Sequence, residues 1–331
     1  MCLHGVVVAV TIAPDPAAQA DSDADEIFVL RALGLGDLMT GLPALRGLRR
    51  TYPSERIVLA APERFRDLAM LSGAVTDVDP TPGLGHVHPR RAPAMAVNLH
   101  GSGPESIADL MALQPKSMLS HRHAGYPELA GPPWRADLHE VDRWCHLMEW
   151  HGINCDPQDL AIDRPAGYPD RSGVVVIHPG AAFGARRWPG ERYAAVAAAL
   201  HGDGYEVVVT GDAKETELAA SVVDRAGLPE SAMLAGTLDL LGLVALISDS
   251  RLLICGDTGV GHVATATGTP SVLLFGPTPP SRWGPRGAGP HVALWAGDCG
   301  DPHGAEPHRG LLLITVPRVL DAVHQMLGES T

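Results

Sequence analysis

The most informative stretch of the chain is Arg251-Leu-Leu-Ile254 followed by Cys255-Gly-Asp257-Thr258-Gly259-Val-Gly261-His262. The first four residues predict a buried strand, and 263–267 (Val-Ala-Thr-Ala-Thr) predict the first turns of a helix. A second apolar run, Ser271–Phe275, follows and leads into Gly276-Pro-Thr-Pro-Pro280. A glycine-rich turn between a strand and a helix points backbone N–H groups and the positive end of the helix dipole at an anion. The stretch therefore predicts a phosphate site on a parallel sheet.

Size and charge exclude several classes of protein. At 331 residues and 45% hydrophobic content, two domains of about 150 residues are expected. The net charge of −13 argues against partners that are nucleic acids or anionic membrane surfaces. No apolar run approaches about 18 residues, so we expect no membrane span, and no Lys or Arg precedes the apolar run at 6–12, so we expect no signal peptide. Five dispersed cysteines favour free thiols in a reducing cytoplasm over a disulfide framework.

Strands and helices alternate twice along the chain, which predicts two Rossmann-like parallel sheets. Strands are expected at 27–31, 56–60 and 94–99 and again at 174–177, 205–210, 233–235, 251–254 and 271–275. Helices are expected at 38–51, 136–150, 192–201, 214–226 and 238–248. The predicted organisation is a flexible extension (1–25), an acceptor-binding domain (26–165), a linker (164–172), a nucleotide-sugar-binding domain (173–315) and a C-terminal helix (316–331). Two such halves imply a ligand cleft between them.

Four motifs in order resemble glycosyltransferase family 9, the ADP-heptose:lipopolysaccharide heptosyltransferases. They are Gly34-Leu-Gly36-Asp37 with Thr40 and Pro43-Ala-Leu45; His178-Pro-Gly180 with Arg186-Arg-Trp188-Pro189; Gly211 with Glu215; and Asp257-Thr-Gly259 with His262, Gly276-Pro-Thr278 and Trp283-Gly-Pro285. They span about residues 27–285. The resemblance implies an α/β GT-B fold, an inverting transfer, an ADP-sugar as the donor substrate, and no cofactor or catalytic metal.

Asp37 matches the family's catalytic base, which takes the proton of the acceptor hydroxyl. The alternative for Asp37 is a helix N-cap that accepts from the amides of 38–40. Arg186 stands where the family usually has Lys, and a cation there would neutralise the pyrophosphate; Arg187 could serve instead, or both could be surface arginines. The expected phosphate contacts are Arg186, Arg187, Thr258, Gly259, Val260 and His262, with a structural role as the alternative for His262.

The same resemblance implies which residues contact the nucleoside. Glu215 matches the residue that contacts the ribose, and its alternative role is a favourable acid in a helix's first turn. The expected nucleoside contacts are Thr210, Gly211, Glu215, Leu238 and Asp257, the last ordering its loop. Arg31, Gly36, His100, His178 and Gly180 are expected to line the cleft, with an edge salt bridge as the alternative for Arg31. The many histidines lack H-x-x-x-H or H-E-x-x-H spacing, so we expect no metal site.

The acceptor is predicted from local charge. Residues 100–160 hold four Lys or Arg against nine Asp or Glu, a balance that disfavours an anionic acceptor. We therefore expect transfer of a heptose or related sugar to a soluble, neutral or cationic acceptor, such as an aminocyclitol intermediate of natural-product biosynthesis. The alternatives are a heptosyltransferase of lipopolysaccharide or another envelope glycan, a nicotinamide-dependent oxidoreductase, and a non-catalytic nucleotide-sugar-binding protein. The turn at Gly34 lacks a complete G-x-G-x-x-G, which counts against the oxidoreductase.

Overall fold

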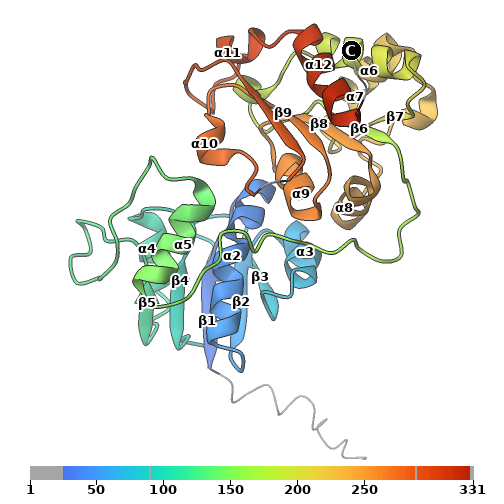
Figure 1. Ribbon diagram of the computed structural model, residues 1–331. Coiled ribbons are helices and arrows are strands. Elements are labelled where there is room, and N and C mark those ends of the chain that lie inside the picture. Colours follow the sequence, from blue (N-terminus) through green and yellow to red (C-terminus); the bar gives the residue numbers. More distant parts are fainter. Residues whose placement is uncertain (1–24, 89–90, 288, 329–331) are drawn as a thin grey trace, which may run out of the picture.

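The computed structural model describes residues 25–88, 91–287 and 289–328, and it shows two α/β domains, one above the other (Figure 1). The predicted extension, 1–25, lies outside the described residues except for Asp25. Each domain contains a five-stranded sheet in which every neighbouring pair of strands is parallel.

The sheet of the first domain has the strand order β3-β2-β1-β4-β5. Ile27 of the central strand is paired with Ile57 on one side and with Met95 on the other. The strands are β1 (Glu26–Leu30), β2 (Arg56–Ala61), β3 (Asp77–Pro80), β4 (Met95–Asn98) and β5 (Ser117–Leu119).

The sheet of the second domain has the order β10-β9-β8-β6-β7, with Val176 paired to Val208 and to Leu253. Its strands are almost continuously apolar because both faces of a parallel sheet are covered. They are β6 (Val175–His178), β7 (Val207–Val209), β8 (Leu252–Gly256), β9 (Ser271–Phe275) and β10 (His291–Trp295).

Helices cover the faces of both sheets. In the first domain these are α2 (Leu35–Thr51), α3 (Arg66–Leu71), α4 (Glu105–Met111) and α5 (Glu140–Trp150). In the second they are α6 (Gly190–Gly202), α7 (Thr216–Ala226), α8 (Leu240–Asp249), α9 (Gly259–Thr267), α10 (Pro280–Trp283), α11 (Arg309–Leu312) and α12 (Val316–Leu327).

The alternation of side chains along each strand divides the core into layers. In the first domain Ile27 and Val29 pack on the side of α2 and α5, whereas Phe28 and Leu30 pack on the side of α4. In the second domain one face of the sheet packs with α8 and α9, and the other packs with α6, α7 and α12. One cluster of buried residues runs through both domains because α2 and α9 pack against each other where the domains meet (Figure 1).

Several expected elements differ from the observed ones. Helix α2 begins at Leu35 rather than at 38, and α9 begins at Gly259 rather than at 263. Residues 233–235 form no strand; Met233 makes only an isolated bridge to Val209. Strands β3, β5 and β10 were not predicted, because they are short or flanked by loops without a clear pattern.

The expectation of free thiols is wrong for one pair, because Cys145 and Cys155 form a disulfide. Cys145 lies in α5, and the chain turns back after this helix through Gly152, whose φ is positive, so that the two Cα atoms lie 5.1 Å apart. Among the described cysteines, Cys255 is free and buried, and Cys299 is free and exposed.

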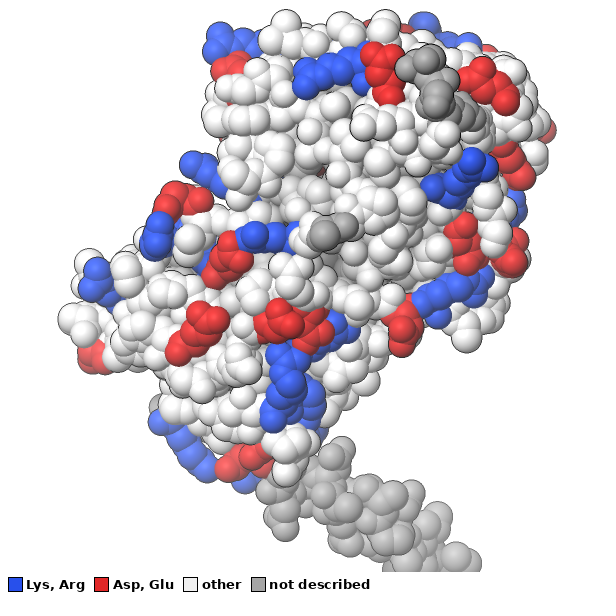
Figure 2. All heavy atoms as spheres, viewed as in Figure 1, with Lys and Arg blue, Asp and Glu red and all other residues white. Residues whose placement is uncertain are grey.

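The surface carries charges of both signs side by side. Figure 2 shows small groups of Lys and Arg beside Asp and Glu, scattered over a mainly uncharged face, rather than one broad basic area. Within the described ranges, no helix has the length and apolar character needed to cross a membrane.

Candidate functional site

Asp37 lies in the first turn of α2, where the first domain faces the second. Its Oδ2 accepts a hydrogen bond from the N–H of Gly34, the N-cap residue, at 3.0 Å. The predicted N-cap alternative is therefore wrong in detail, because Asp37 is the third helical residue and reaches back to the cap. Its side chain is 25% exposed, so one carboxylate oxygen is anchored and the group still reaches the cleft.

Arg31 follows β1 and lies completely buried beside Asp37. Its Nη2 is 3.7 Å from Asp37 Oδ1 and 3.3 Å from Glu140 Oε1, and its guanidinium lies over the ring of Trp144 at 4.9 Å. A Cβ on Gly41 would lie 2.8 Å from Arg31 Nε, so α2 needs a glycine there to admit this side chain. Arg31 is thus an internal ion-pair partner. It does not line the cleft, as was expected, because its side chain is fully buried, and it does not form the edge salt bridge that was the alternative.

The environment of Asp37 raises the pKa of its carboxyl group. Burial is the main cause; the nearby Arg31 acts in the opposite direction, and Glu140 raises the pKa further. A raised pKa makes a carboxylate a stronger base, which suits the abstraction of a proton from a hydroxyl group.

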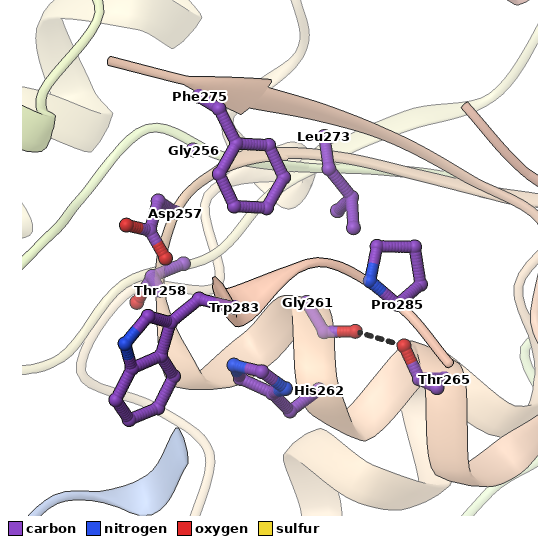
Figure 3. A pocket seen from close by; sticks show the side chains of 10 residues that line it. All are labelled: Gly256, Asp257, Thr258, Gly261, His262, Thr265, Leu273, Phe275, Trp283 and Pro285. Carbon is purple, nitrogen blue, oxygen red and sulfur yellow. Dashed lines mark hydrogen bonds between the residues drawn. The ribbon is translucent and has the colours of Figure 1, made fainter. Parts of the chain in front are cut away.

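The turn between β8 and α9 forms the facing wall, and Figure 3 shows the pocket around it. Thr258 is the N-cap of α9, and Gly261 and His262 lie in the first helical turn. The cavity volume is only about 10 Å³, enough for about one water molecule and far below the roughly 300–1,000 Å³ of ordinary ligand sites, so the pocket in this conformation is too small for a nucleotide sugar. Asp257 is buried and bonded to Thr278, and burial raises the pKa of Asp257 to about 6.

Gly36 and Gly259 let the two domains touch at this point. A Cβ on Gly259 would lie 2.7 Å from Leu35 Cβ and 2.8 Å from Gly36 N. A Cβ on Gly36 would lie 3.0 Å from His262 Cδ2. The structure therefore brings the predicted base and the predicted phosphate turn to one place.

Arg186 lies near both Asp37 and Asp257, and its positive charge offsets part of the rise that burial causes in the pKa of each carboxyl group. Its Nε is buried without a hydrogen-bond partner, and its guanidinium lies 5.4 Å from the ring centre of Phe183. Arg187 is exposed, and its Nε donates to the carbonyl of Ala181 at 2.7 Å. Of the two arginines, Arg186 is thus the one that faces the cleft.

His262 is half-buried and contacts Trp283 edge to face, with ring centres 5.7 Å apart. Burial lowers the pKa of His262 to about 4, and the charges of His139 and Arg31 act in the same direction. The imidazole is therefore neutral at pH 7 and can donate one hydrogen bond without adding charge.

Three of the predicted nucleoside contacts, Thr210, Gly211 and Glu215, gather beyond the carboxyl end of β7, whereas Asp257 lies in the turn after β8 and Leu238 precedes α8. The Glu215 carboxylate lies over Gly180, where a Cβ would approach Glu215 Oε1 to 2.0 Å, and it also adjoins Gly211. Glu215 Oε2 accepts from the N–H of Asp212 at 2.9 Å and lies 3.8 Å from His178 Nε2. The ring of His178 is bonded in turn to Thr210 Oγ1 at 3.1 Å. Leu238 is partly exposed just before α8.

His100 follows β4 on the first domain's side of the cleft. Its Nδ1 is buried without a hydrogen-bond partner. Burial lowers the pKa of His100 to about 4, with Arg31 as a second cause. A neutral imidazole with an unused nitrogen is suited to a hydrogen bond with an acceptor hydroxyl.

Helix α5 contributes residues to the site that were not predicted from the sequence. Its N-cap, His139, accepts from the N–H of Val141 through Nδ1 and donates from Nε2 to the carbonyl of Gly284 in the other domain, at 2.9 Å. Asp142 forms an ion pair with Arg286, also across the domains. Glu140 joins the Arg31 cluster. Only the density of His, Trp and acidic residues in 136–150 hinted at this role.

No group of three or more His, Cys, Asp or Glu that could hold a metal ion occurs within the part of the chain that the structure describes.

Comparisons with known proteins agree with this geometry. The sequence model described as glycosyltransferase family 9 (heptosyltransferase) matches residues 129–297, about half of the chain. The chain belongs to glycosyltransferase family 9. The resemblance stated from the four motifs is thereby confirmed. Membership of this family rules out the alternative function of a nicotinamide-dependent oxidoreductase.

Relatives within family 9 align along nearly the whole chain. Lipopolysaccharide heptosyltransferase 2 of Salmonella typhimurium is 27% identical over 92% of this chain and 99% of its own length. The Escherichia coli K12 protein of the same name is 28% identical over 91% of this chain and 98% of its own. Among solved structures, a family 9 glycosyltransferase from Veillonella parvula superposes with a TM-score of 0.77 (22% identity, 92% and 98% covered). Escherichia coli ADP-heptose lps heptosyltransferase II superposes with a TM-score of 0.73 (24% identity, 91% and 98% covered). The predicted GT-B fold is confirmed.

Proposed function

We propose that this family 9 enzyme transfers heptose from ADP-heptose to a hydroxyl group of a saccharide or cyclitol acceptor, with Asp37 as the general base. The observation that carries the proposal is the position of Asp37, which is held by Gly34 and faces Arg186 and the β8–α9 turn of the other domain. A base on one wall and an anion site on the other is the arrangement that an inverting displacement needs.

The proposed reaction forms one bond and breaks one. The acceptor oxygen attacks the anomeric carbon while its proton passes to the Asp37 carboxylate. The bond between the anomeric carbon and the β-phosphate oxygen breaks, and ADP leaves with the electron pair. Arg186 and the N-terminus of α9, at Thr258, Gly259 and Val260, stabilise the charge that develops on the pyrophosphate. These groups do the work that a metal ion does elsewhere, so we expect transfer with inversion and without a metal.

The nucleotide is expected to lie on the second domain, with its ribose at Glu215. The Glu215 carboxylate occupies the space that the missing side chain of Gly180 leaves over β6, and two acceptor oxygens suit the two hydroxyl groups of a ribose. ADP should therefore stabilise the protein in a thermal-shift screen that also includes UDP, GDP and dTDP, because a ligand stabilises by mass action. Stabilisation by UDP or GDP but not by ADP would overturn this assignment.

Two acceptor classes have support. The named function of the relatives, lipopolysaccharide heptosyltransferase, favours a core-oligosaccharide acceptor. Local charge favours a neutral or cationic acceptor, because Arg135 is paired with Asp137, Arg143 with Glu140 and Arg31 with both Glu140 and Asp37. Incubation with ADP-heptose and either a deacylated lipopolysaccharide core or an aminocyclitol separates the two. The true acceptor gains the mass of one heptosyl unit.

The role of Asp37 is tested by Asp37→Asn, with Asp67→Asn at an exposed position of α3 as the matched control. The amide can still accept the hydrogen bond from Gly34, so folding and ADP affinity should be nearly unchanged. Removal of a general base typically slows a reaction about 10²–10⁴-fold, and we expect a loss in that range. A variant that melts earlier but keeps its turnover would show that Asp37 is only structural, and His100 would be the next candidate for the base.

A further inference from the structure

Glu140 is a buried carboxylate that the proposed reaction does not use. It is the first residue of α5 and 5% exposed. Its Oε1 accepts from Trp144 Nε1 at 2.8 Å and from Arg31 Nη2 at 3.3 Å, and its Oε2 accepts from Arg143 Nη1. All three donors are side chains, and Trp144 also packs against the Arg31 guanidinium. Removing a carboxylate from water costs free energy even when three donors surround it, so stability alone is a weak explanation for Glu140.

Arg31 connects Glu140 to the proposed base. Its Nε donates to the carbonyl of Asp37 and its Nη1 to the carbonyl of Leu99. Its Nη2 carries two hydrogens, and these go to Thr40 Oγ1, at 3.0 Å, and to Glu140 Oε1. Asp37 Oδ1 lies 3.7 Å from Nη2, close enough for attraction but beyond hydrogen-bond distance.

Which acceptors bind the two hydrogens of Arg31 Nη2 affects the basicity of Asp37. A carboxylate that accepts a guanidinium hydrogen directly is stabilised in its ionised form and becomes a weaker base. Thr40 and Glu140 occupy both Nη2 hydrogens, so the Asp37 oxygen keeps its lone pairs for an incoming hydroxyl group. Without Glu140, Arg31 could turn one Nη2 hydrogen to Asp37.

We propose that Glu140 is a positioning residue, which holds the Arg31 guanidinium so that Asp37 Oδ1 stays free to accept the acceptor's proton. This inference rests on the proposed function, because it concerns the base of that reaction. Glu140 does not touch the substrate; it acts through Arg31. The contact joins residues 109 positions apart in the chain, from β1 and α5.

The charged side chains that act on Asp37 come from three separate segments. Arg31 comes from the end of β1, Glu140 from α5 and Arg186 from the loop after β6. His262 from α9 and His100 from the end of β4 are nearby, and burial keeps the pKa of each near 4, so both are neutral where the enzyme would work. Glu140 is thus the negative charge that raises the Asp37 pKa, and its removal should lower that pKa.

The test is Glu140→Gln, with Glu149→Gln, exposed on the same helix, as the control. Two readouts are needed: the pH profile of kcat/KM for heptosyl transfer, and the titration of the Asp37 carboxyl carbon by NMR in protein labelled at aspartate, assigned with Asp37→Asn. We expect Glu140→Gln to move the acidic limb and the titration midpoint to lower pH and to slow the plateau rate at least about tenfold, within the range of general-base effects. The dissociation constant for ADP should change less than about twofold, and Glu149→Gln should behave as wild type.

Because Gln leaves Arg143 without its ion-pair partner, the variant could fail to fold. The double variant Glu140→Gln/Arg143→Gln removes both charges of the pair and should show the same downward shift. An Asp37 titration that does not move in any folded variant would overturn the proposal. So would a rate loss accompanied by an equal loss of ADP affinity. If wild type transfers no heptose yet the titration shifts, the role of Glu140 stands and the proposed function fails.

Discussion

Replacement of Asp257 by Asn should stabilise the ligand-free protein at neutral pH, although it alters a residue of the donor site. The carboxyl group is buried, and its pKa is raised from 3.8 to about 6, mainly by burial. A group whose folded-state pKa lies above its unfolded value contributes stability below the unfolded pKa, and that contribution is lost as pH rises through the folded pKa. At pH 7.5 the ionised Asp257 is therefore a net cost.

The size of that cost follows from the shift. About two pKa units at 1.36 kcal/mol each correspond to about 3 kcal/mol above pH 7. The same relation leaves roughly half of the cost near pH 5 and little at pH 4. Asn can still accept the hydrogen bond from Thr278, so the substitution removes the charge and keeps the contact. The pKa of about 6 already includes the attraction of Arg186, which lowers it, so about 3 kcal/mol is the net cost of the charge.

The assay is denaturant unfolding without nucleotide at several pH values between 5 and 7.5. Asp321→Asn, exposed on α12, is the matched control and should change nothing. We expect Asp257→Asn to be more stable than wild type at pH 7.5 and the difference to shrink steadily toward pH 5. A variant that is less stable at pH 7.5, or a gain that is independent of pH, would refute the reasoning and show that the ionised carboxylate is stabilised by Arg186 more than it is penalised by burial.

Three further outcomes are expected. Arg186→Ala should weaken ADP binding by about 1.5–3 kcal/mol in calorimetry, since it removes a charged hydrogen-bond donor. Arg187→Ala should leave ADP binding unchanged. Wild-type ADP affinity in both variants would assign the binding of the pyrophosphate to the backbone amides. Transfer should persist in EDTA, and activity that chelation abolishes and magnesium restores would contradict a metal-free leaving-group site. Gly259→Ala should slow transfer more than it weakens ADP binding, because the new Cβ would lie within 2.7–2.8 Å of Leu35 and Gly36 and force the domains apart; wild-type kinetics would show that this contact is not needed.

The order of the elements and the position of the cleft could be predicted from the sequence because the patterns behind them are local. Apolar runs followed by glycine-rich turns mark strands that end at one edge of a parallel sheet. Asp37 and Asp257 each follow such a strand, one in each sheet, so both were expected at the cleft between the halves, and the structure places both where the domains meet. The family motifs placed the catalytic base in the turn that holds Asp37 and the phosphate site in the turn that begins at Asp257.

Element boundaries were less predictable where no side chain marks them. Helix α2 begins after Gly34, which has no side chain to signal a cap, so Asp37 was expected outside the helix and lies within its first turn. Strands β3 and β5 are three or four residues long, too short for a periodic pattern. The Cys145–Cys155 disulfide depends on the turn after α5, which spacing alone does not reveal.

The electrostatics of the site could be seen only after the chain had folded. Arg31, Glu140 and Trp144 come from two distant segments, and nothing in either segment names the other as its partner. Gly41 matters because its missing side chain admits Arg31, a relation between a helix and the strand before it. Whether a carboxylate is a strong base or a histidine is neutral depends on burial and on neighbouring charges, and both are products of tertiary packing. The sequence names the groups that could react, and packing sets how acidic each one is.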